Sequence, residues 1–345
     1  MSDSLKLSKS SRLVFVGAGA IGGVSAGLIK KQGYDVDIIT KYKDLATLIT
    51  SEGIQVMTPR GNFTVIIPAY ATVDGLTGKF DLIFMAVKAT DLPEAIKSIK
   101  PFMHDKSAIV TMENGICEDL VASLVGTDRT IGCITGWGAT MHAPGNVEMT
   151  STGEFIIGNL DNSTDDRLIQ VQEILSVVNP CYISENLYGS LYSKLIINSC
   201  ITSLGAVCGL YLGEMLAKYH VREIFIRIIK ESIAVANAMG LKVEVYGGKL
   251  DYYDMIKSDS WFAKRKRHLL IRLIGFKYRK LKSSSLQSLE RNKPTEIDFF
   301  NGYIAQQGKK YHISTPINDL VVSQIKEIEA GTRPISPDNF EEYSI

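Results

Sequence analysis

The sequence is poor in the features that would mark a disulfide-stapled or zinc-binding protein. It has five cysteines in 345 residues, an odd number, with no Cys-x-x-Cys pair and no nearby His/Asp motif. We expect buried, reduced thiols and no metal site, with a catalytic thiol as the lesser alternative. The cysteines are Cys117, Cys133, Cys181, Cys200 and Cys208.

An excess of charge and a long uninterrupted hydrophobic run are also lacking. The formal net charge is +1, so overall charge does not indicate nucleic-acid or membrane binding, and such a role would need a local patch. Residues 1–11 are polar and lack the apolar core of a signal peptide. The largely apolar residues 195–212 are interrupted by polar residues and glycines, which predicts a buried helix rather than a membrane span. We expect a cytoplasmic protein.

A short apolar run, residues 13–16, leads into Gly-x-Gly-x-x-Gly and then into a helical pattern. Gly17 permits a tight turn, Gly19 lets backbone N–H groups approach a pyrophosphate, and Gly22 allows close packing of helix on strand. The phosphates would lie at the helix N-terminus, where free N–H groups favour anions. This order predicts a dinucleotide site, although a glycine turn that binds nothing is the alternative. The expected cofactor contacts here are Gly17, Gly19, Ala20, Ile21 and Gly22.

The end of the next predicted strand, residues 34–40, bears on the choice of cofactor. An acidic residue at this strand end accepts the ribose 2′-hydroxyl of NAD, whereas a basic residue favours the 2′-phosphate of NADP. Asp37 lies inside the strand, and Lys41 follows its end. The sequence therefore favours NADP(H), although Lys41 as a solvated surface lysine is the alternative.

Two further predicted strands end in candidate polar residues. Residues 80–87 are followed by Lys88, and residues 108–112 by Glu113-Asn114-Gly115. The carboxyl ends of parallel strands border the ligand crevice, so Lys88 and Asn114 are candidates to bind cofactor or substrate. A lysine at a loop edge and an ordinary Asn-Gly turn are the alternatives.

The remaining patterns indicate two domains. We expect a hairpin insert over residues 53–70, strands over 131–158 that complete the sheet, a helix over 165–178 and a last strand at 182–183. From residue 185 onward helical patterns dominate, over 187–212, 213–239, 251–274, 296–311 and 316–329. This order predicts an α/β, Rossmann-type doubly wound domain over 1–184 and an all-α domain over 185–345.

The helix expected over residues 187–212 carries a polar stripe. Lys194, Asn198 and Thr202 are spaced i, i+4, i+8 and so share one face, among apolar neighbours. A lysine at the border of a buried helix needs hydrogen-bond partners or a lowered pKa, which is how a general acid is tuned. A lysine that extends to solvent from a helix edge is the alternative.

Further along, Thr295 followed by Asp298 fits a helix N-cap with an acidic residue three positions later. Glu296 would then stand at the start of a helix, where the dipole favours its charge. Helix capping alone is the alternative explanation of both acidic residues.

Together these motifs resemble the ketopantoate reductase (2-dehydropantoate 2-reductase) family over nearly the whole chain. The order and spacing of the three C-terminal motifs, which contain Lys194, Ser284 and Glu296, are more specific than the glycine motif. The motifs are residues 17–22, Val87-Lys88-Ala89, Asn114-Gly115, Pro144-Gly145-x-Val147, Lys194-Leu195 with Asn198, Ser284 with Leu286-Gln287, and Thr295-Glu296-Ile297-Asp298 with Asn301-Gly302.

The resemblance implies a helical domain similar to the C-terminal domain of 6-phosphogluconate dehydrogenase and reduction of ketopantoate to (R)-pantoate by NADPH. It implies that Lys194 is the general acid and that Glu296 lies close to this lysine, to the substrate hydroxyl and to the cofactor. Asn114, Asn198 and Ser284 would hold substrate, Lys88 would act where cofactor and substrate meet, and Lys41 would bind the 2′-phosphate.

Two departures leave the substrate open. Thr202 stands where the family often has a second asparagine, and the segment of residues 242–282 is longer than in compact members, with basic and aromatic residues over 261–282. That segment suits an anionic substrate, an anionic membrane surface or RNA, or is an amphipathic insertion with solvated lysines. Another 2-oxo acid as substrate and a non-catalytic NADP(H) sensor are the competing functions. The apolar helices are compatible with a homodimer.

Overall fold

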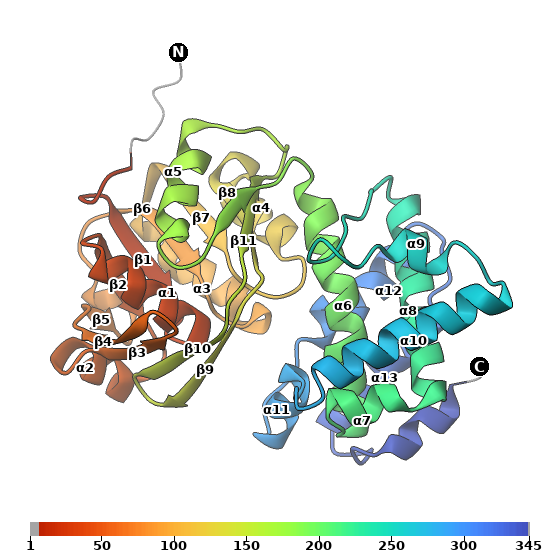
Figure 1. Cartoon of the computed structure of the whole chain (residues 1–345). Coiled ribbons are helices and arrows are strands. Elements are labelled where there is room, and N and C mark those ends of the chain that lie inside the picture. The colour runs from red at the N-terminus through yellow and green to blue at the C-terminus, as the bar shows by residue number, and fades with distance from the viewer. Residues whose placement is uncertain (1–6, 344–345) are drawn as a thin grey trace. The chain divides into compact units, whose positions relative to one another are not determined.

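The computed structural model describes residues 7–343, and the chain divides into two compact units, residues 1–187 and 188–345. The expected polar character of residues 1–11 falls largely outside the described residues. Figure 1 labels most of the helices and strands of the two units.

The first unit is built on an eight-stranded sheet in the order β12-β11-β8-β7-β6-β1-β2-β5. Neighbouring strands are parallel except β11, which is antiparallel to β8. The order runs outward from β1 in both directions, which confirms the doubly wound prediction. The strands are β1 (Arg12–Val16), β2 (Asp35–Ile39), β5 (Ala69–Tyr70), β6 (Phe80–Met85), β7 (Met103–Thr111), β8 (Thr130–Thr135), β11 (Phe155–Asn159) and β12 (Cys181–Ile183).

Apolar residues of the central strands form the core of this unit. Phe15 of β1 and Phe84 of β6 are fully buried, and their rings stack at 4.5 Å. Such continuous burial is typical of parallel strands covered on both faces. The helices are α1 (Ala20–Lys31), α2 (Lys43–Ser51), α3 (Leu92–Ile99), α4 (Glu118–Val125) and α5 (Asp166–Ser176), with short 3-10 turns η1 (Val73–Gly75), η2 (Ala89–Asp91), η3 (Lys100–Phe102) and η4 (Thr127–Arg129).

A second sheet packs on α1, in the order β4-β3-β10-β9 (Figure 1). Its strands are β3 (Ile54–Thr58), β4 (Gly61–Val65), β9 (Gly138–Ala143) and β10 (Asn146–Ser151). The hairpin expected over residues 53–70 is confirmed for β3 and β4. The prediction that residues 131–158 complete the main sheet is wrong for β9 and β10, because only β8 and β11 join it.

Two glycines of α1 explain how the second sheet approaches this helix. A Cβ on Gly23 would lie 2.8 Å from Cδ1 of Ile54, and one on Gly27 would lie 2.6 Å from Cγ2 of Val56. The bare backbone therefore lets the apolar side chains of β3 pack directly on the helix. These glycines follow the Gly-x-Gly-x-x-Gly motif and serve packing rather than a ligand.

Glu118, the first residue of α4, is a buried carboxyl outside the predicted site. Its Oε1 accepts a hydrogen bond from the Thr111 hydroxyl at 2.8 Å, and its Oε2 accepts one from the Cys117 backbone N–H at 2.9 Å. Burial, which dominates over these hydrogen bonds, raises the pKa of Glu118 to about 7.

The raised pKa of Glu118 predicts that the folded protein loses stability as the pH rises. Between pH 4.5, where a glutamate ordinarily titrates, and about 7, the unfolded chain ionises Glu118 while the folded chain keeps the proton, so the free energy of unfolding falls as pH rises. The full loss is about 3 kcal/mol. Glu118→Gln should remove this slope, because an amide does not ionise and the Thr111 hydroxyl can donate to the Ile131 carbonyl oxygen at 3.3 Å instead. Urea unfolding of the original protein and of Glu118→Gln between pH 4.5 and 8 measures this slope. Parallel pH profiles of the two proteins would contradict a raised pKa of Glu118.

In the described part of the second unit, helices dominate, and the strand-like contact is an isolated bridge between Tyr246 and Leu250, so the all-α prediction is confirmed. The helix expected over 316–329 matches α13 to the residue. The elements are α6 (Leu187–Cys208), α7 (Leu212–Ala217), α8 (Tyr219–Ala238), α9 (Tyr252–Ile256), α10 (Trp261–Lys277), α11 (Ser284–Glu290), η5 (Ile297–Phe299), α12 (Asn301–Lys310), α13 (Pro316–Glu329) and η6 (Pro337–Glu342).

Three of the expected helices are interrupted. The helix predicted over 213–239 breaks at Lys218, whose ψ of 128° is extended. There the Arg222 guanidinium donates to the carbonyl oxygens of Leu216 and Ala217, both at 2.7 Å, and so satisfies the end of α7. The helix predicted over 251–274 divides into α9 and α10, and Ser260 caps α10 by accepting from the Ala263 N–H. The helix predicted over 296–311 breaks at Phe300.

The apolar helix α6 is a core helix. It is long and apolar enough to cross a membrane, but 83% of its most apolar window is buried inside the structure. The prediction of a buried helix for this segment is therefore confirmed.

All five cysteines are buried, and none of them forms a disulfide. Burial raises the pKa of Cys181 to about 12 and of Cys208 to about 11, and it also raises that of Cys200. A nucleophilic cysteine needs the opposite, an accessible thiol with a lowered pKa. These three thiols are therefore structural.

Candidate active site

The glycine turn between β1 and α1 has the geometry that the sequence predicts. Gly17 has φ of +112°, and a Cβ there would lie 2.4 Å from the Ala86 carbonyl oxygen. A Cβ on Gly22 would lie 2.1 Å from the Gly17 carbonyl oxygen, so this position also requires glycine. Both positions require glycine because the turn, α1 and the end of β6 approach one another closely.

Gly19 differs from these two glycines because a Cβ there would meet no atom within 4 Å. It is the N-cap of α1, without a side-chain cap, and no acidic residue lies in the first turn. The space beside Gly19, at the start of the helix whose first residues are Ala20 and Ile21, is therefore open. This arrangement fits the pyrophosphate of a dinucleotide.

Lys41, the second residue after β2 ends at Ile39, makes an ion pair that the sequence did not predict. Its Nζ donates to Oδ2 of Asp91 at 3.0 Å, and this hydrogen bond is the main cause of its raised pKa. Both side chains are exposed, so the pair adds little stability. Asp91 ends η2, directly after Lys88-Ala89-Thr90, and its place after a strand end is the signal that could have identified it.

Inside β2, Asp37 is accounted for by a structural partner. Its Oδ2 accepts a hydrogen bond from Arg12 Nη2 at 3.0 Å, and burial raises its pKa. Because it is buried within the strand, Asp37 does not occupy the strand end where a ribose hydroxyl would bind.

Lys88 and Asn114 follow β6 and β7 and are both half-buried. Lys88 is the residue before η2 in an extended conformation, and Gly115 has φ of +90°, which permits the turn after Asn114. Strands β7, β6, β1 and β2 are consecutive and parallel, so their carboxyl ends share one edge of the sheet. The structure therefore brings the glycine turn, Lys41, Lys88 and Asn114 to the same edge.

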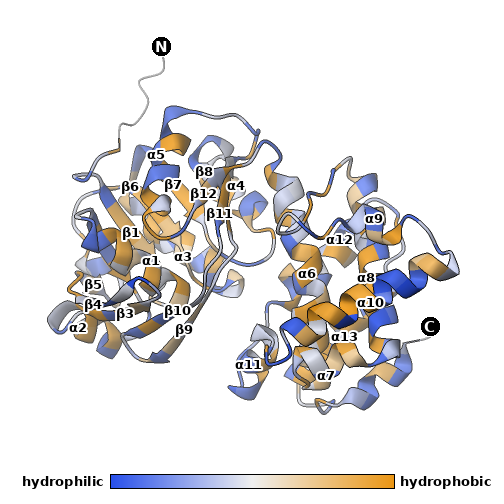
Figure 2. Cartoon of the chain, in the orientation of Figure 1, coloured by the Kyte–Doolittle hydropathy of each residue, from blue (hydrophilic) through white to orange (hydrophobic). Residues whose placement is uncertain are grey.

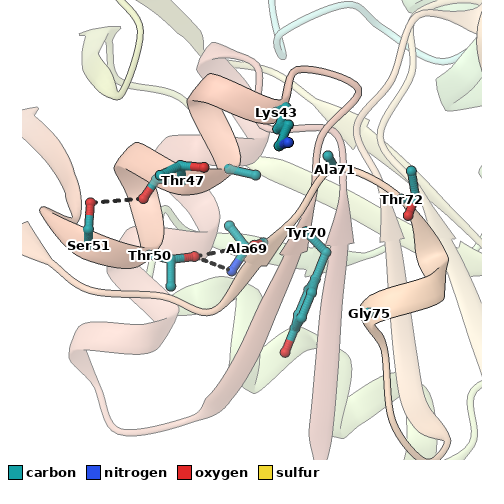
Figure 3. A pocket seen from close by; sticks show the side chains of 10 residues that line it. Lys43, Thr47, Thr50, Ser51, Ala69, Tyr70, Ala71, Thr72 and Gly75 are labelled. Atoms are coloured by element: carbon teal, nitrogen blue, oxygen red, sulfur yellow. Dashed lines mark hydrogen bonds between the residues drawn. The ribbon is translucent and has the colours of Figure 1, made fainter.

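A pocket of about 410 Å³ lies between α2 and the segment from β5 to η1 (Figure 3). The side chains of Lys43, Thr47 and Thr72 are among those around it, and the Thr50 hydroxyl is engaged with the backbone of Ala69. No residue of the predicted site lines this pocket.

On α6, the polar stripe is the accessible part of an otherwise buried helix. Between Tyr188 and Cys208, the half-buried residues after the first turn are Ser190, Lys194, Asn198 and Ile201, at helical spacing. Thr202 is only 8% exposed and is the least accessible of the three predicted residues. Lys194 and Asn198 therefore lie side by side on the one accessible face.

The same face continues to Gly205, where α11 approaches. A Cβ on Gly205 would lie 2.8 Å from Cβ of Ser283. Ser283 is buried and caps α11 by accepting from the Leu286 N–H at 3.0 Å, whereas the predicted Ser284 is the exposed first residue of that helix. The sequence did not single out Ser283, although a serine three residues before Leu286 is an N-cap signal.

Thr295 is not the N-cap of a long helix, because α12 begins only at Asn301, but its hydroxyl accepts a hydrogen bond from the Ile297 N–H at 3.3 Å at the start of η5. Its N–H and hydroxyl both donate to Oε1 of Glu329 at 2.7 Å, and Asp298 accepts from Lys326 at 2.6 Å, so both residues bind α13. The half-buried Glu296 precedes the short turn η5, and α12 begins only at Asn301. The Asn301 amide donates to the Ser199 carbonyl oxygen at 3.3 Å, which ties the start of α12 to α6.

Within residues 7–343, no group of three or more His, Cys, Asp or Glu residues is arranged to hold a metal ion. The polar residues that the two units present are lysines, amides, hydroxyls and one glutamate. These groups suit binding of an anionic substrate and proton transfer to an oxygen atom.

Comparison with known families identifies both units. The family described as "Ketopantoate reductase PanE/ApbA" matches residues 13–162, and "Ketopantoate reductase PanE/ApbA C terminal" matches residues 186–329. Together they cover most of the chain and include every predicted site residue.

Curated relatives and solved structures agree. The 2-dehydropantoate 2-reductase of Pyrococcus horikoshii is 28% identical over 321 residues, which are 92% of this chain and 98% of that protein. A ketopantoate reductase family structure from Ralstonia eutropha has a TM-score of 0.79 at 25% identity and covers 93% of this chain and 99% of its own. A D-mandelate dehydrogenase with NADH and anilino(oxo)acetate shares the fold, with a TM-score of 0.79 at 20% identity over 93% of this chain and 99% of its own. The chain belongs to the ketopantoate reductase family and is an oxidoreductase of the 2-oxo acid reductase type.

Proposed function

We propose that this protein is a cytoplasmic NADPH-dependent 2-dehydropantoate 2-reductase that makes (R)-pantoate for pantothenate and coenzyme A synthesis. The observation that carries the proposal is the accessible stripe of Lys194 and Asn198 on the buried helix α6. It is supported by relatives named 2-dehydropantoate 2-reductase that match over nearly their whole length.

The sheet edge of the first unit would hold the cofactor. The N-terminus of α1 would bind the pyrophosphate at Gly19, Ala20 and Ile21, and Lys41 would bind the 2′-phosphate. Lys88 and Asn114 would contact the nicotinamide half and the substrate. When bound, NADPH supplies the hydride for the ketone carbon.

The second unit would hold and protonate the ketone. In this proposal the Lys194 ammonium donates its proton to the carbonyl oxygen, which becomes the hydroxyl of the product. Asn198, Thr202 and Ser284 would hydrogen-bond the carboxylate and hydroxyl of the substrate. Glu296 would orient Lys194 and accept a hydrogen bond from the substrate hydroxyl.

Steady-state NADPH oxidation over a panel of 2-oxo acids tests the function. Turnover of 2-dehydropantoate with the highest kcat/KM supports the proposal. A higher value on another 2-oxo acid, such as an aryl-substituted one, would replace the substrate, and NADPH binding without turnover on any of them would leave a sensor. The panel includes an aryl-substituted 2-oxo acid because a dehydrogenase for D-mandelate shares this fold.

The Lys41–Asp91 pair gives a prediction about cofactor preference. Lys41→Glu should raise KM for NADPH about tenfold or more while changing KM for NADH little, because only NADPH carries the 2′-phosphate. Asp91→Asn should lower KM for NADPH relative to KM for NADH, because it releases Lys41 from its carboxylate partner. KM values for both cofactors measure this, with Lys9→Glu, an exposed lysine of the same unit, as the control. An unchanged NADPH/NADH ratio in both site variants would refute the role of Lys41.

A homodimer remains a prediction, and size-exclusion chromatography with light scattering tests it.

A further inference from the structure

The helix α10 is firmly held along one face by α7 and α8. Gly275 lets α10 approach α7, since a Cβ there would lie 2.8 Å from Cβ of Leu216. On the α8 side, His268 Nε2 lies 2.6 Å from Oε1 of Glu223, and its ring stacks on Tyr219 at 4.4 Å. Arg267 binds Asp259 at 2.7 Å. The orientation of the helix is therefore fixed.

The opposite face of α10 is apolar and exposed. Phe262, Leu269, Leu273 and Phe276 are between 56% and 78% exposed. Their spacing of i, i+7, i+11 and i+14 places them within about 60° of one another around the helix. Figure 2 shows hydrophilic and hydrophobic residues mixed along α10. A continuous exposed apolar strip of this kind marks an interaction surface.

Basic side chains border this strip along both edges. By the same helical spacing, Arg265 and Arg272 lie on one side, and Lys266 and Lys277 lie on the other, all exposed. Residues 261–289 contain no aspartate or glutamate. The guanidinium of Arg265 lies 4.0 Å from the centre of the Trp261 ring, so an aromatic side chain is held beside the strip at the start of the helix.

We propose that the outer face of α10 binds the surface of an anionic lipid bilayer. Apolar side chains would enter the interface between headgroups and acyl chains, and the lysines and arginines on both edges would contact the anionic headgroups. A helix of 17 residues is about 25 Å long, so the strip can lie flat on the surface. The enzyme would then associate with the membrane peripherally, without a spanning segment.

The charge pattern favours a bilayer over other partners. Two copies meeting through this face would place the basic edges of one against those of the other, with no acidic residue of residues 261–289 to offset the repulsion. RNA would engage the basic and aromatic residues but leaves Leu269 and Leu273 without a role, since stacking requires flat rings.

Vesicle binding of the full-length protein tests the proposal. Vesicles containing equal amounts of phosphatidylcholine and phosphatidylglycerol should bind the protein, and pure phosphatidylcholine should not. The chain has two tryptophans, and Trp137 is 6% exposed while Trp261 is 57% exposed, so a blue shift of fluorescence on binding reports on α10. Trp261→Phe should remove that shift and keep co-sedimentation.

Paired variants identify the surface. Arg265→Gln with Arg272→Gln should weaken binding about 25-fold, at about fivefold for each basic residue near an anionic surface. Lys309→Gln with Lys310→Gln removes the same charge from α12 and should have little effect. Leu273→Ser should also weaken binding without unfolding the protein, because the side chain is exposed.

Three results would overturn the proposal. The first is no binding to anionic vesicles, and the second is equal weakening by both charge pairs. The third is a dimer or an RNA complex that Leu273→Ser or the α10 charge pair disrupts while vesicles remain unbound.

Discussion

Lys194→Ala is expected to lower kcat for ketone reduction by about a hundredfold to ten-thousandfold and to leave the affinity for NADPH nearly unchanged. The proposed role of Lys194 is to give a proton to the carbonyl oxygen as the alkoxide develops, an interaction made in the transition state. The cofactor contacts proposed for the first unit involve other residues. Stopped-flow turnover and fluorescence titration with NADPH separate the two effects.

The control for this experiment is Lys218→Ala, which removes an exposed lysine between α7 and α8 in the same unit and should not change kcat. Asn198→Ala, one helical turn from Lys194, should raise KM for the ketone more than it lowers kcat. If Lys194→Ala lowered NADPH affinity and thermal stability as much as turnover, the lysine would be structural.

The second large effect concerns two glycines that look alike in sequence. Gly22→Ala should destabilise the protein by about 1–3 kcal/mol, because its Cβ would lie 2.1 Å from the Gly17 carbonyl oxygen and 2.9 Å from Cβ of Ala86. Gly19→Ala should leave stability within about 0.5 kcal/mol, because nothing lies within 4 Å of its Cβ. The loss in Gly19→Ala should appear instead as about 10- to 100-fold weaker NADPH binding, since a methyl group would occupy the space proposed for a phosphate.

Urea unfolding and NADPH titration of both variants measure this difference. Ala18→Gly, a substitution between Gly17 and Gly19, controls for general loosening of the turn. Equal destabilisation by Gly19→Ala and Gly22→Ala would show that the space at Gly19 is not a ligand site.

The main sheet and the glycine turn could be predicted because their signals are local. The apolar strands of the first unit are short, and each ends in a turn or a polar residue, so their alternation with helices predicts a doubly wound sheet. Gly17 and Gly22 are required by backbone approach within a few residues. The stripe of Lys194 and Asn198 follows from helical spacing alone, and the structure adds that it is the accessible face of α6.

What the sequence could not predict depends on partners far along the chain. Asp91 is 50 residues from Lys41, and Glu329 is 34 residues from Thr295, so no local pattern shows which carboxylate pairs with which partner. For the same reason the local pattern predicts a helix cap at Thr295, although the N–H and hydroxyl of this residue both donate to a carboxylate of α13. Strands β9 and β10 have ordinary strand patterns, and only the pairing of β10 with β3, and of β9 with β10, places them in the second sheet.

Helix α1, which begins at the glycine turn, is packed on both sides. Gly22 lets the helix approach the end of β6 in the main sheet, and Gly23 and Gly27 let the second sheet pack on its other face. In the proposed function, its N-terminal amides are therefore already oriented for the pyrophosphate before a dinucleotide binds. The entropy of arranging the phosphate cradle is lost once, when the chain folds, and it does not recur with each catalytic cycle.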